Sequence, residues 1–486
     1  MGIIDKVKTF IANDKEKTLI AYSSNDIGTI GIAASLIDNT PRVQSYLIYN
    51  NNLVELTHRA ARICVGMGIE SDVDKQKKNI SKILGLGHES ISEHTNLITA
   101  LVITNANLTE LLDFLSSLKY LNYHKYELNN YETLILIGGS IRGYKHIIRN
   151  TSLNNIYVQK IIELLYSTPK EFYEDFIKDG IMEEKYFTEN YTYNKCEFDS
   201  DNRETDRAHL ISIDDYSWIA KTISHDFNIA VNVRDILDLC TATFLFEKIS
   251  RTASHQLVRH RNSISQESQR YVDYSNSTFV NPLKDKGLDA DKYLNVEILG
   301  AKHKFTMDDI ANISIKLYNQ LREDGLAKED ARAILPNNVT TKLYMTFTFT
   351  NLIKFLELRT AKGAQAEIRT LANEVKDIFL SNTKYIFKDE EDMYSYLEPL
   401  YKEIKYNTYD EVDEAQDEKI AIEEMSLEDM VEFSEKTSHD AIHGFEIQIE
   451  TKEELDKCDK TKTVYVNSES SIFKYINDGW KRIVNS

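Results

Sequence analysis

The chain is poor in the residues that define several structural classes. Its 486 residues include only 17 glycines, five prolines and four cysteines. This composition excludes collagen-like and elastic proteins, and it argues against a turn-rich all-β fold. Cys64, Cys196, Cys240 and Cys458 show no metal-type spacing, so the sequence predicts reduced thiols and no metal site.

Long apolar runs are also missing. No stretch approaches the roughly 20 apolar residues that a membrane-spanning helix needs. Charges interrupt residues 1–17, and position 6 lacks the Ser or Thr of a myristoylation signal, so we expect neither a secretory leader nor a lipid anchor. The sequence therefore predicts a cytoplasmic protein with no membrane partner.

Basic residues are outnumbered, with 58 Lys and Arg against 77 Asp and Glu, a net charge of −19. Such a balance argues against a general nucleic-acid coat, and the 42% hydrophobic content excludes a wholly disordered chain. The charge is uneven, because 18 acids and three lysines in 389–435 account for −15 of it. The rest of the chain is nearly balanced.

Composition divides the chain into three parts, with boundaries predicted at 1–200, 201–388 and 389–486. Apolar residues nearly vanish in 196–209, which is the predicted linker between the first two parts. The third part is the acidic extension, whose role the sequence leaves open.

Periodicity predicts secondary structure in the first two parts. We expect a helix over 109–121 and a strand over 133–139. A long helix is expected over 235–261, and another over 343–379. A capped helix is expected over 306–325, with an apolar stripe of Ile310, Ile313, Leu317 and Leu321.

The segment 250–275 holds the densest group of chemically active side chains. If 246–259 is helical, Arg251, His255 and Arg259 share one face. If 265–271 is a strand, Gln266, Ser268 and Arg270 share one face. This pattern suits an anionic ligand with a planar, hydrogen-bonding ring. The alternatives are a solvated basic patch and a loose nucleic-acid contact.

Four motifs in order resemble the flavin-dependent thymidylate synthase family. QLVRHR…SQRY (256–271) is similar to its RHR-spacer-Ser signature, and GHESISEH (87–94) to its GHxSxxEH segment. ARAILP (331–336) and LELRTAKGAQAEIR (356–369) resemble its ARxxLP and LRxxxxAQxEIR segments. The matches span roughly 50–380.

The resemblance implies an α+β fold, in which helices pack on an antiparallel sheet. It also implies an enzyme that reductively methylates dUMP to dTMP. It implies FAD as cofactor, and methylenetetrahydrofolate and NADPH as co-substrates. The residues expected to bind dUMP are Gln256, Arg259, Gln266, Ser268, Arg270, Arg332 and Arg359, with Arg359 in a catalytic role that favours ionisation at the uracil N3. Those expected to bind FAD are His88, Ser90, Arg142, His146, Arg259, His260, Arg261 and Gln266.

The order of the motifs departs from the family pattern. GHESISEH normally lies just before RHR, but here about 165 residues separate His94 from Arg259. The spacer from Arg261 to Ser268 is also one residue shorter than usual. The family's C-terminal segment occurs twice, at 134–148 and at 343–359.

We interpret this as two tandem copies of the family fold with divided functions. The first copy keeps GHESISEH and a flavin-type segment, Ser140-x-Arg142…His146, but has only 123–130 where RHR is expected. The second keeps RHR and the predicted dUMP residues. The resemblance further implies a homodimer that forms a pseudo-tetramer.

Other readings remain open at this point. One copy can simply have decayed, or the protein can be a non-catalytic nucleotide-binding or flavin-binding relative. A nucleic-acid-binding module that uses the RHR region is the third alternative. Zinc at His88 and His94 is disfavoured because the HExxH spacing is absent.

Overall fold

The computed structural model forms two compact units, 1–400 and 401–486. It describes residues 42–49, 52–104, 106, 108–129, 131–188, 207–227 and 229–400, and the strands β1 (Leu19–Tyr22), β12 (Ile447–Ile449), β13 (Thr463–Val466), β14 (Ser471–Ile476) and β15 (Gly479–Asn485). In the second unit these last four strands form one sheet in chain order. The acidic stretch 401–435 and the predicted linker over 196–206 lie outside the described residues.

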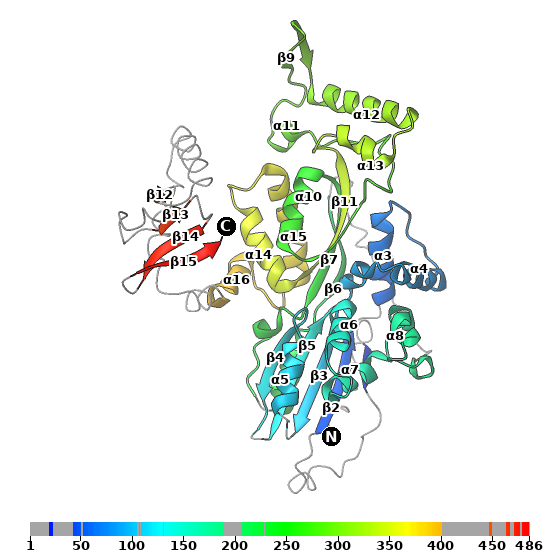
Figure 1. The fold of residues 1–486 in the computed structure, drawn as a ribbon, viewed down its shortest axis with the longest axis vertical. Helices are drawn as coiled ribbons and strands as arrows, with labels where there is room; N and C mark the ends of the chain where they lie inside the picture. Colours follow the sequence, from blue (N-terminus) through cyan, green and yellow to red (C-terminus); the bar gives the residue numbers. More distant parts are fainter. Residues whose placement is uncertain are drawn as a thin grey trace. The chain divides into compact units, whose positions relative to one another are not determined.

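The first half of unit 1 contains a five-stranded antiparallel sheet with helices around it (Figure 1). After β1 its elements are β2 (Arg42–Tyr49), α3 (Leu53–Cys64), α4 (Val73–Gly85), η2 (Glu89–His94), β3 (Leu97–Thr104), α5 (Leu108–Ser116), β4 (Asn122–Glu127), β5 (Glu132–Gly139), α6 (Ile141–Asn150), α7 (Ile156–Leu165), η3 (Lys170–Phe172), α8 (Glu174–Lys178) and η4 (Glu184–Tyr186).

The second half contains a four-stranded antiparallel sheet and a projecting hairpin. Its elements are β6 (Ala208–Asp214), α9 (Trp218–Phe227), η5 (Val233–Ile236), β7 (Thr241–Ser250), α10 (Arg251–Leu257), η6 (Val258–His260), β8 (Ser263–Gln266), α11 (Pro282–Asp285), β9 (Leu294–Ile298), β10 (Ala301–Phe305), α12 (Met307–Glu323), α13 (Lys328–Ala331), η7 (Arg332–Ile334), β11 (Thr340–Thr348), α14 (Phe349–Thr360), α15 (Ala366–Asn382) and α16 (Glu390–Ser395).

The two sheets share one topology. Apart from the edge strand β1, their strand orders are β2-β3-β5-β4 and β6-β7-β11-β8. In both, the last of these four strands along the chain lies between the second and the third. In each half a helix follows the first strand, and the fourth strand leads directly into a capped helix, α6 or α14. The α+β prediction with antiparallel sheets and packed helices is confirmed.

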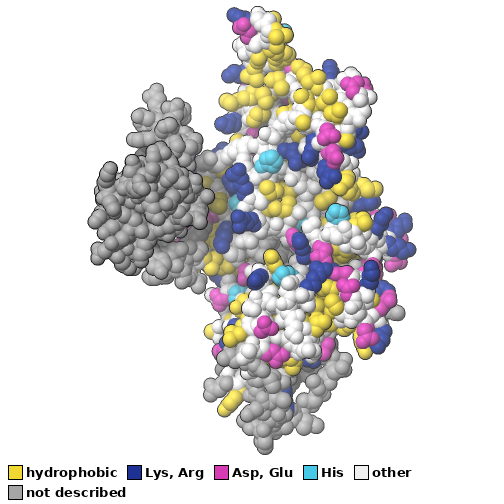
Figure 2. Space-filling view, in the orientation of Figure 1, with side chains coloured by type: hydrophobic (Ala, Val, Ile, Leu, Met, Phe, Trp, Pro, Cys, Tyr) yellow, Lys and Arg dark blue, Asp and Glu magenta, His cyan; other side chains and the backbone are white. Residues whose placement is uncertain are grey.

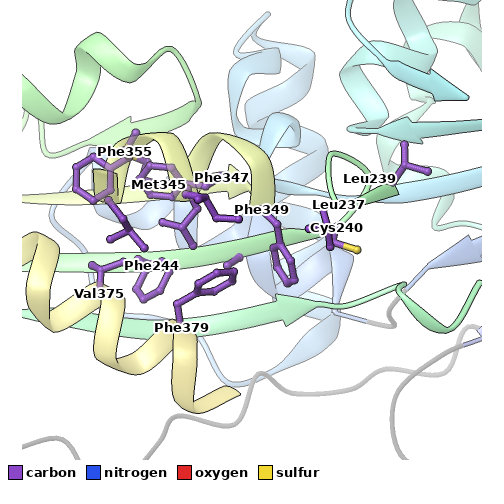
Figure 3. Close-up of a cluster of buried hydrophobic side chains, with 14 of the residues drawn as sticks. Leu237, Leu239, Cys240, Phe244, Met345, Phe347, Phe349, Phe355, Val375 and Phe379 are labelled. Atoms are coloured by element: carbon purple, nitrogen blue, oxygen red, sulfur yellow. The ribbon is translucent and has the colours of Figure 1, made fainter. Parts of the chain in front are cut away.

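Strand periodicity divides each sheet into two buried faces. In β3, Leu97, Leu101 and Ile103 pack with α6 and α7, while Ile98 and Val102 pack against residues of the second half. In β7, Phe244 and Phe246 pack with α14 and α15, in the core that Figure 3 shows around Phe347, Phe355 and Phe379. Residues on both faces of these strands are buried, so each sheet has a core on either side.

The halves are joined by helices that pack on the opposite sheet. Ile219 and Ile223 of α9 pack against Ile98 and Leu136 of the first sheet. Conversely, Leu56 and Ala60 of α3 belong to a cluster with Tyr344 of β11. Each half therefore buries apolar surface of the other, which is why 1–400 forms a single unit.

Some predicted elements are right and others are wrong. The strand over 133–139 and the capped helix over 306–325 are confirmed, with Thr306 accepting a hydrogen bond from the Asp309 amide. The helix predicted over 235–261 is right only in its last part, where α10 and η6 lie, because 241–250 is strand β7. The helix predicted from 343 is wrong over its first part, which is strand β11. Strands buried on both faces carry apolar runs that resemble buried helices.

The apolar stripe predicted for the helix over 306–325 is a core face only in part, because Leu321 packs against the cluster around Tyr318 and Ile310 is half-buried. Ile313 and Leu317 are 43% and 47% exposed, and Ala311 and Tyr318 are buried instead. In the space-filling view, apolar side chains are visible over this region of the surface (Figure 2).

At its end, the second half extends past the predicted boundary at 388. Met393 and Leu397 are fully buried in the core with α14 and α15. None of the described helices is long and apolar enough to cross a membrane.

Candidate functional site

A cleft of about 540 Å³ lies where the two halves of unit 1 meet. The first half contributes η2, the end of β5 and α6, and the second contributes the residues around β7, β8, β11 and the start of α14. The lining residues on which the following argument depends are Glu89, Glu93, Tyr120, Ser140, Arg142, Gly143, His146, Arg149, Asp238, Arg261, Asn262, Thr348 and Asn351.

Two helix N-termini border this cleft. The Ser140 hydroxyl caps α6 by accepting a hydrogen bond from the Gly143 amide at 3.3 Å. The Thr348 hydroxyl caps α14 in the same way, accepting from the Asn351 amide at 3.2 Å. Because a helix carries partial positive charge at its N-terminus, both ends favour a negatively charged group in the cleft.

Three arginines also line the cleft near these helix N-termini. Arg142 pairs with Glu93, and Arg149 donates to both oxygens of Glu89 at 2.9 and 2.6 Å. Arg261, within the described part of the chain, makes no side-chain hydrogen bond or ion pair. Its φ of 48° is left-handed, a conformation that is uncommon for residues other than glycine and often found at functional sites.

A buried lysine holds the wall of the cleft. Lys145 is 3% exposed in its side chain and pairs with Asp175 at 2.8 Å and with Glu89 at 3.1 Å. Hydrogen bonds from Arg149, together with the charge of Lys145, lower the pKa of Glu89 to about 2. Glu89 therefore stays ionised at neutral pH and fixes η2 against α6.

His94 joins the two halves behind the cleft. Its two ring nitrogens share hydrogen bonds with the hydroxyls of Thr346 and Ser265, each at 3.0 Å. Burial lowers the pKa of His94 to about 3, so the ring is neutral at physiological pH. The last residue of GHESISEH is thus a cross-link between the first half and strands β8 and β11.

The predicted flavin residues are only partly brought together. Arg142 and His146 of the first half and Arg261 of the second line one cleft, although more than 100 residues separate them in sequence. His88 and Ser90 are exposed on the segment whose Glu89 and Glu93 line it. Five predicted flavin residues do not line the cleft: His88, Ser90, Arg259, His260 and Gln266.

The residues predicted for dUMP make contacts in separate groups. Arg270 pairs with the Glu329 side chain at 2.7 Å, and Arg332 donates to the Glu329 carbonyl at 3.0 Å. The backbone amide of Arg270 donates to the Ser268 hydroxyl at 3.2 Å. The strand predicted over 265–271 ends at Gln266, so the expected alternation of Ser268 and Arg270 on one strand face is wrong.

A second group surrounds the end of α14. The Arg359 Nε donates to the His260 Nε2 at 3.0 Å, which requires a neutral His260 that accepts at this atom. Burial and the charge of Arg359 lower the pKa of His260 to about 4, in keeping with this tautomer. Nearby in sequence, Gln256 of α10 donates to Gln365, and Gln266 donates to Ser254 at 2.9 Å.

Comparisons with known proteins show similarity over part of the chain. The family model described as thymidylate synthase complementing protein matches residues 169–382. A flavin-dependent thymidylate synthase of Geobacter sulfurreducens is 36% identical over 157 residues, which cover 32% of this chain and 63% of that protein. The enzyme of Sulfolobus acidocaldarius is 34% identical over 177 residues, covering 35% and 60%.

Over part of its length, the chain is similar to the flavin-dependent thymidylate synthases. It spans about three fifths of the length of these relatives. A solved UMP/dUMP methylase of Streptomyces cacaoi, bound with 5-Br UMP, is 22% identical and covers 36% of this chain and 88% of its own, with a TM-score of 0.27.

Several residues that line the cleft were not predicted from the sequence. Arg149 lies seven positions after Arg142, which places both on one helix face, so helical spacing alone contains that signal. Thr348 is not among the predicted site residues, yet it caps α14 at the cleft. Tyr120 and Asn262 carry no such signal, because only the tertiary fold brings them to the cleft.

Proposed function

We propose that this protein is a flavin-dependent thymidylate synthase that converts dUMP to dTMP. Methylenetetrahydrofolate gives the carbon, NADPH the electrons, and FAD binds in the cleft between the two halves. The proposal rests on one observation: Arg142, His146 and Arg261 line the same cleft. These residues belong to separate motifs, and the resemblance assigns all three to FAD.

The cleft is large enough for a dinucleotide, and Arg261 is the arginine of its lining that has no acidic partner among the described residues. Its volume of about 540 Å³ lies within the ~300–1,000 Å³ typical of cofactor and ligand sites. Arg261 and the N-termini of α6 and α14 favour phosphate, and Arg142 is held at the rim by Glu93. Reduced flavin, when bound, supplies the hydride equivalent that turns a transferred methylene into a methyl group.

The dUMP residues act by charge and orientation. We assign the phosphate and uracil oxygens to the groups around Arg270, Arg332 and Gln256, with Ser268 as a further donor. Arg359 is oriented by neutral His260, so that its guanidinium presents a fixed charge to the uracil N3. A fixed cation there lowers the pKa of N3 and makes the ring electron-rich at C5.

We infer that the two halves arose by tandem duplication and now divide the work. Their common strand order supports this, and so do the matching caps Ser140 and Thr348 at the same point of each topology. The first half retains the η2 segment and Arg142, and the second retains RHR and Arg359. Because one chain supplies both sides of the cleft, a homodimer would contain four such folds and two clefts of this kind.

The test is formation of dTMP by purified protein with dUMP, methylenetetrahydrofolate, NADPH and FAD under reducing, anaerobic conditions. We expect a bound flavin spectrum and turnover that depends on all four components. Bound flavin without dTMP would leave a non-catalytic flavin-binding relative, and a protein that takes up no flavin would refute the proposal.

Arg359→Lys should lower kcat at least about 10-fold with little change in thermal unfolding, because lysine keeps the charge but loses the planar fork that bonds His260. The measurement is dTMP turnover beside calorimetry. Lys354→Arg, on the same helix, serves as the control, because no role is assigned to that side chain. Wild-type turnover in Arg359→Lys would remove Arg359 from the catalytic role.

A further inference from the structure

Tyr120 is an aromatic ring left exposed at the rim of the cleft. It lines the cleft, and 69% of the residue is exposed. Its ring lies edge-on to that of His146, with 4.5 Å between the ring centroids and an angle of 86° between the planes. Two rings from different segments thus meet nearly at a right angle at the rim, and most of the tyrosine surface is exposed.

The backbone at Tyr120 is held in place by the packing of the next residue, Leu121, and the Tyr120 side chain is not needed for this. The neighbouring Leu121 is buried against Gly139 and Gly143. A Cβ on Gly143 would lie 2.4 Å from the Leu121 Cδ2 and 3.1 Å from the Tyr120 carbonyl oxygen. At position 143 only glycine fits without displacing residues 120 and 121. The backbone that bears the Tyr120 ring is therefore held in one position.

In the second half, Arg261 lies at the position that is topologically equivalent to Tyr120. Tyr120 lies two residues before β4, and Arg261 lies two residues before β8, the corresponding strand. The residues that follow also correspond: Leu121 packs on Gly143, while Asn262 accepts a hydrogen bond from Asn351 at 3.2 Å. The two equivalent positions line one cleft, one with an aromatic ring and the other with a cation.

We propose that Tyr120, supported by His146, stacks against a planar heteroaromatic ring of the nucleotide cofactor, while Arg261 attracts its phosphates. This rests on the proposed function and assigns a binding residue to it. An exposed ring on a rigid support stacks at little entropic cost, and its flat face suits a flavin or an adenine ring. The two halves would then supply stacking and charge from equivalent positions.

The experiment measures binding of FAD, FMN and ADP to the full chain by calorimetry, and of the two flavins also by fluorescence. Tyr120→Ala should weaken FAD binding about 10-fold. Tyr120→Phe should keep the affinity but raise the emission of the bound flavin if the isoalloxazine is the stacked ring, because phenylalanine does not quench by electron transfer as tyrosine does. Tyr131→Ala, a matched exposed tyrosine that does not line the cleft, should match the wild type.

FMN and ADP identify the stacked ring. A loss of FMN affinity in Tyr120→Ala assigns the isoalloxazine, and a loss of ADP affinity assigns the adenine; either result supports the proposal. Unchanged affinity for FAD, FMN and ADP, with the unfolding temperature of the wild type, would overturn it while leaving the proposed function intact. Wild-type protein that binds no flavin would overturn both.

Gly143→Ala gives a second, independent measurement. The added methyl group must push Leu121 and the Tyr120 backbone away, so FAD affinity should fall in the same direction as in Tyr120→Ala. In the double variant the two losses should not add, because both act through one ring. Full additivity would contradict a shared mechanism and count against the stacking role.

Discussion

Replacing either Arg142 or Arg261 with alanine should weaken FAD binding about 10- to 100-fold, since a hydrogen bond to a charged group contributes ~1.5–3 kcal/mol. The two residues come from different halves and are 119 positions apart, yet they line one cleft. Arg261 has no competing side-chain partner within the described part of the chain, so its loss removes charge directly from the ligand.

The loss of Arg142 acts in a second way. Its partner Glu93 then faces the cleft unpaired and repels an anionic ligand. We therefore expect Arg142→Ala to show the stronger dependence on ionic strength, and Arg142→Ala with Glu93→Gln to recover part of the affinity. Flavin titration at two salt concentrations measures both effects.

Two exposed lysines provide matched controls. Lys125 on β4 and Lys342 on β11 pair with Glu127 and Glu247, and neither lines the cleft. Their alanine variants should bind FAD as the wild type does, within about twofold, because distant surface charges are screened beyond ~8 Å at physiological salt. If only one of the two arginine variants loses affinity, the idea of a flavin site shared between the halves fails.

His94→Ala should lower the free energy of unfolding by about 2–4 kcal/mol, because it leaves the buried hydroxyls of Thr346 and Ser265 without this partner and opens a cavity. The same change removes the cross-link between the halves and should loosen flavin binding through η2. Chemical denaturation measures the first effect. His255→Ala, at an exposed position, is the control.

His94 should also make the free energy of unfolding of the wild type decrease as the pH is lowered. Burial lowers the pKa of His94 from its ordinary 6.5 to about 3, so between these values the unfolded chain binds a proton that the folded chain does not. His94 therefore contributes a loss of up to ~1.4 kcal/mol per pH unit as the pH falls through this window. The contribution is fully present above pH 6.5.

His94→Gln separates the titration from the packing. Glutamine can hydrogen-bond but does not titrate, so the variant should lose the His94 share of the slope between about pH 3 and 6.5. His58 and His260, whose pKa values burial also lowers, to about 4 in both, should keep their own shares. A slope equal to that of the wild type would show that His94 is protonated in the folded protein.

The sequence by itself determined the resemblance to flavin-dependent thymidylate synthases, the antiparallel α+β class and the identity of three residues that line the cleft. These are local properties. The capped helix over 306–325 and the strand over 133–139 follow from the spacing of neighbouring side chains, and Arg142, His146 and Arg261 lie inside short ordered motifs.

Only the tertiary structure decided which segments meet. The sequence of strand β7 predicts a helix because both of its faces are buried, and on the second face Leu245 packs against a cluster with Leu56 and Ala60 of the first half. Tyr120 and Arg261 reach one cleft because equivalent loops of two similar sheets converge there. His94 stays neutral because β8 and β11 exclude water around it. These contacts join residues far apart in sequence, and local periodicity carries no record of them.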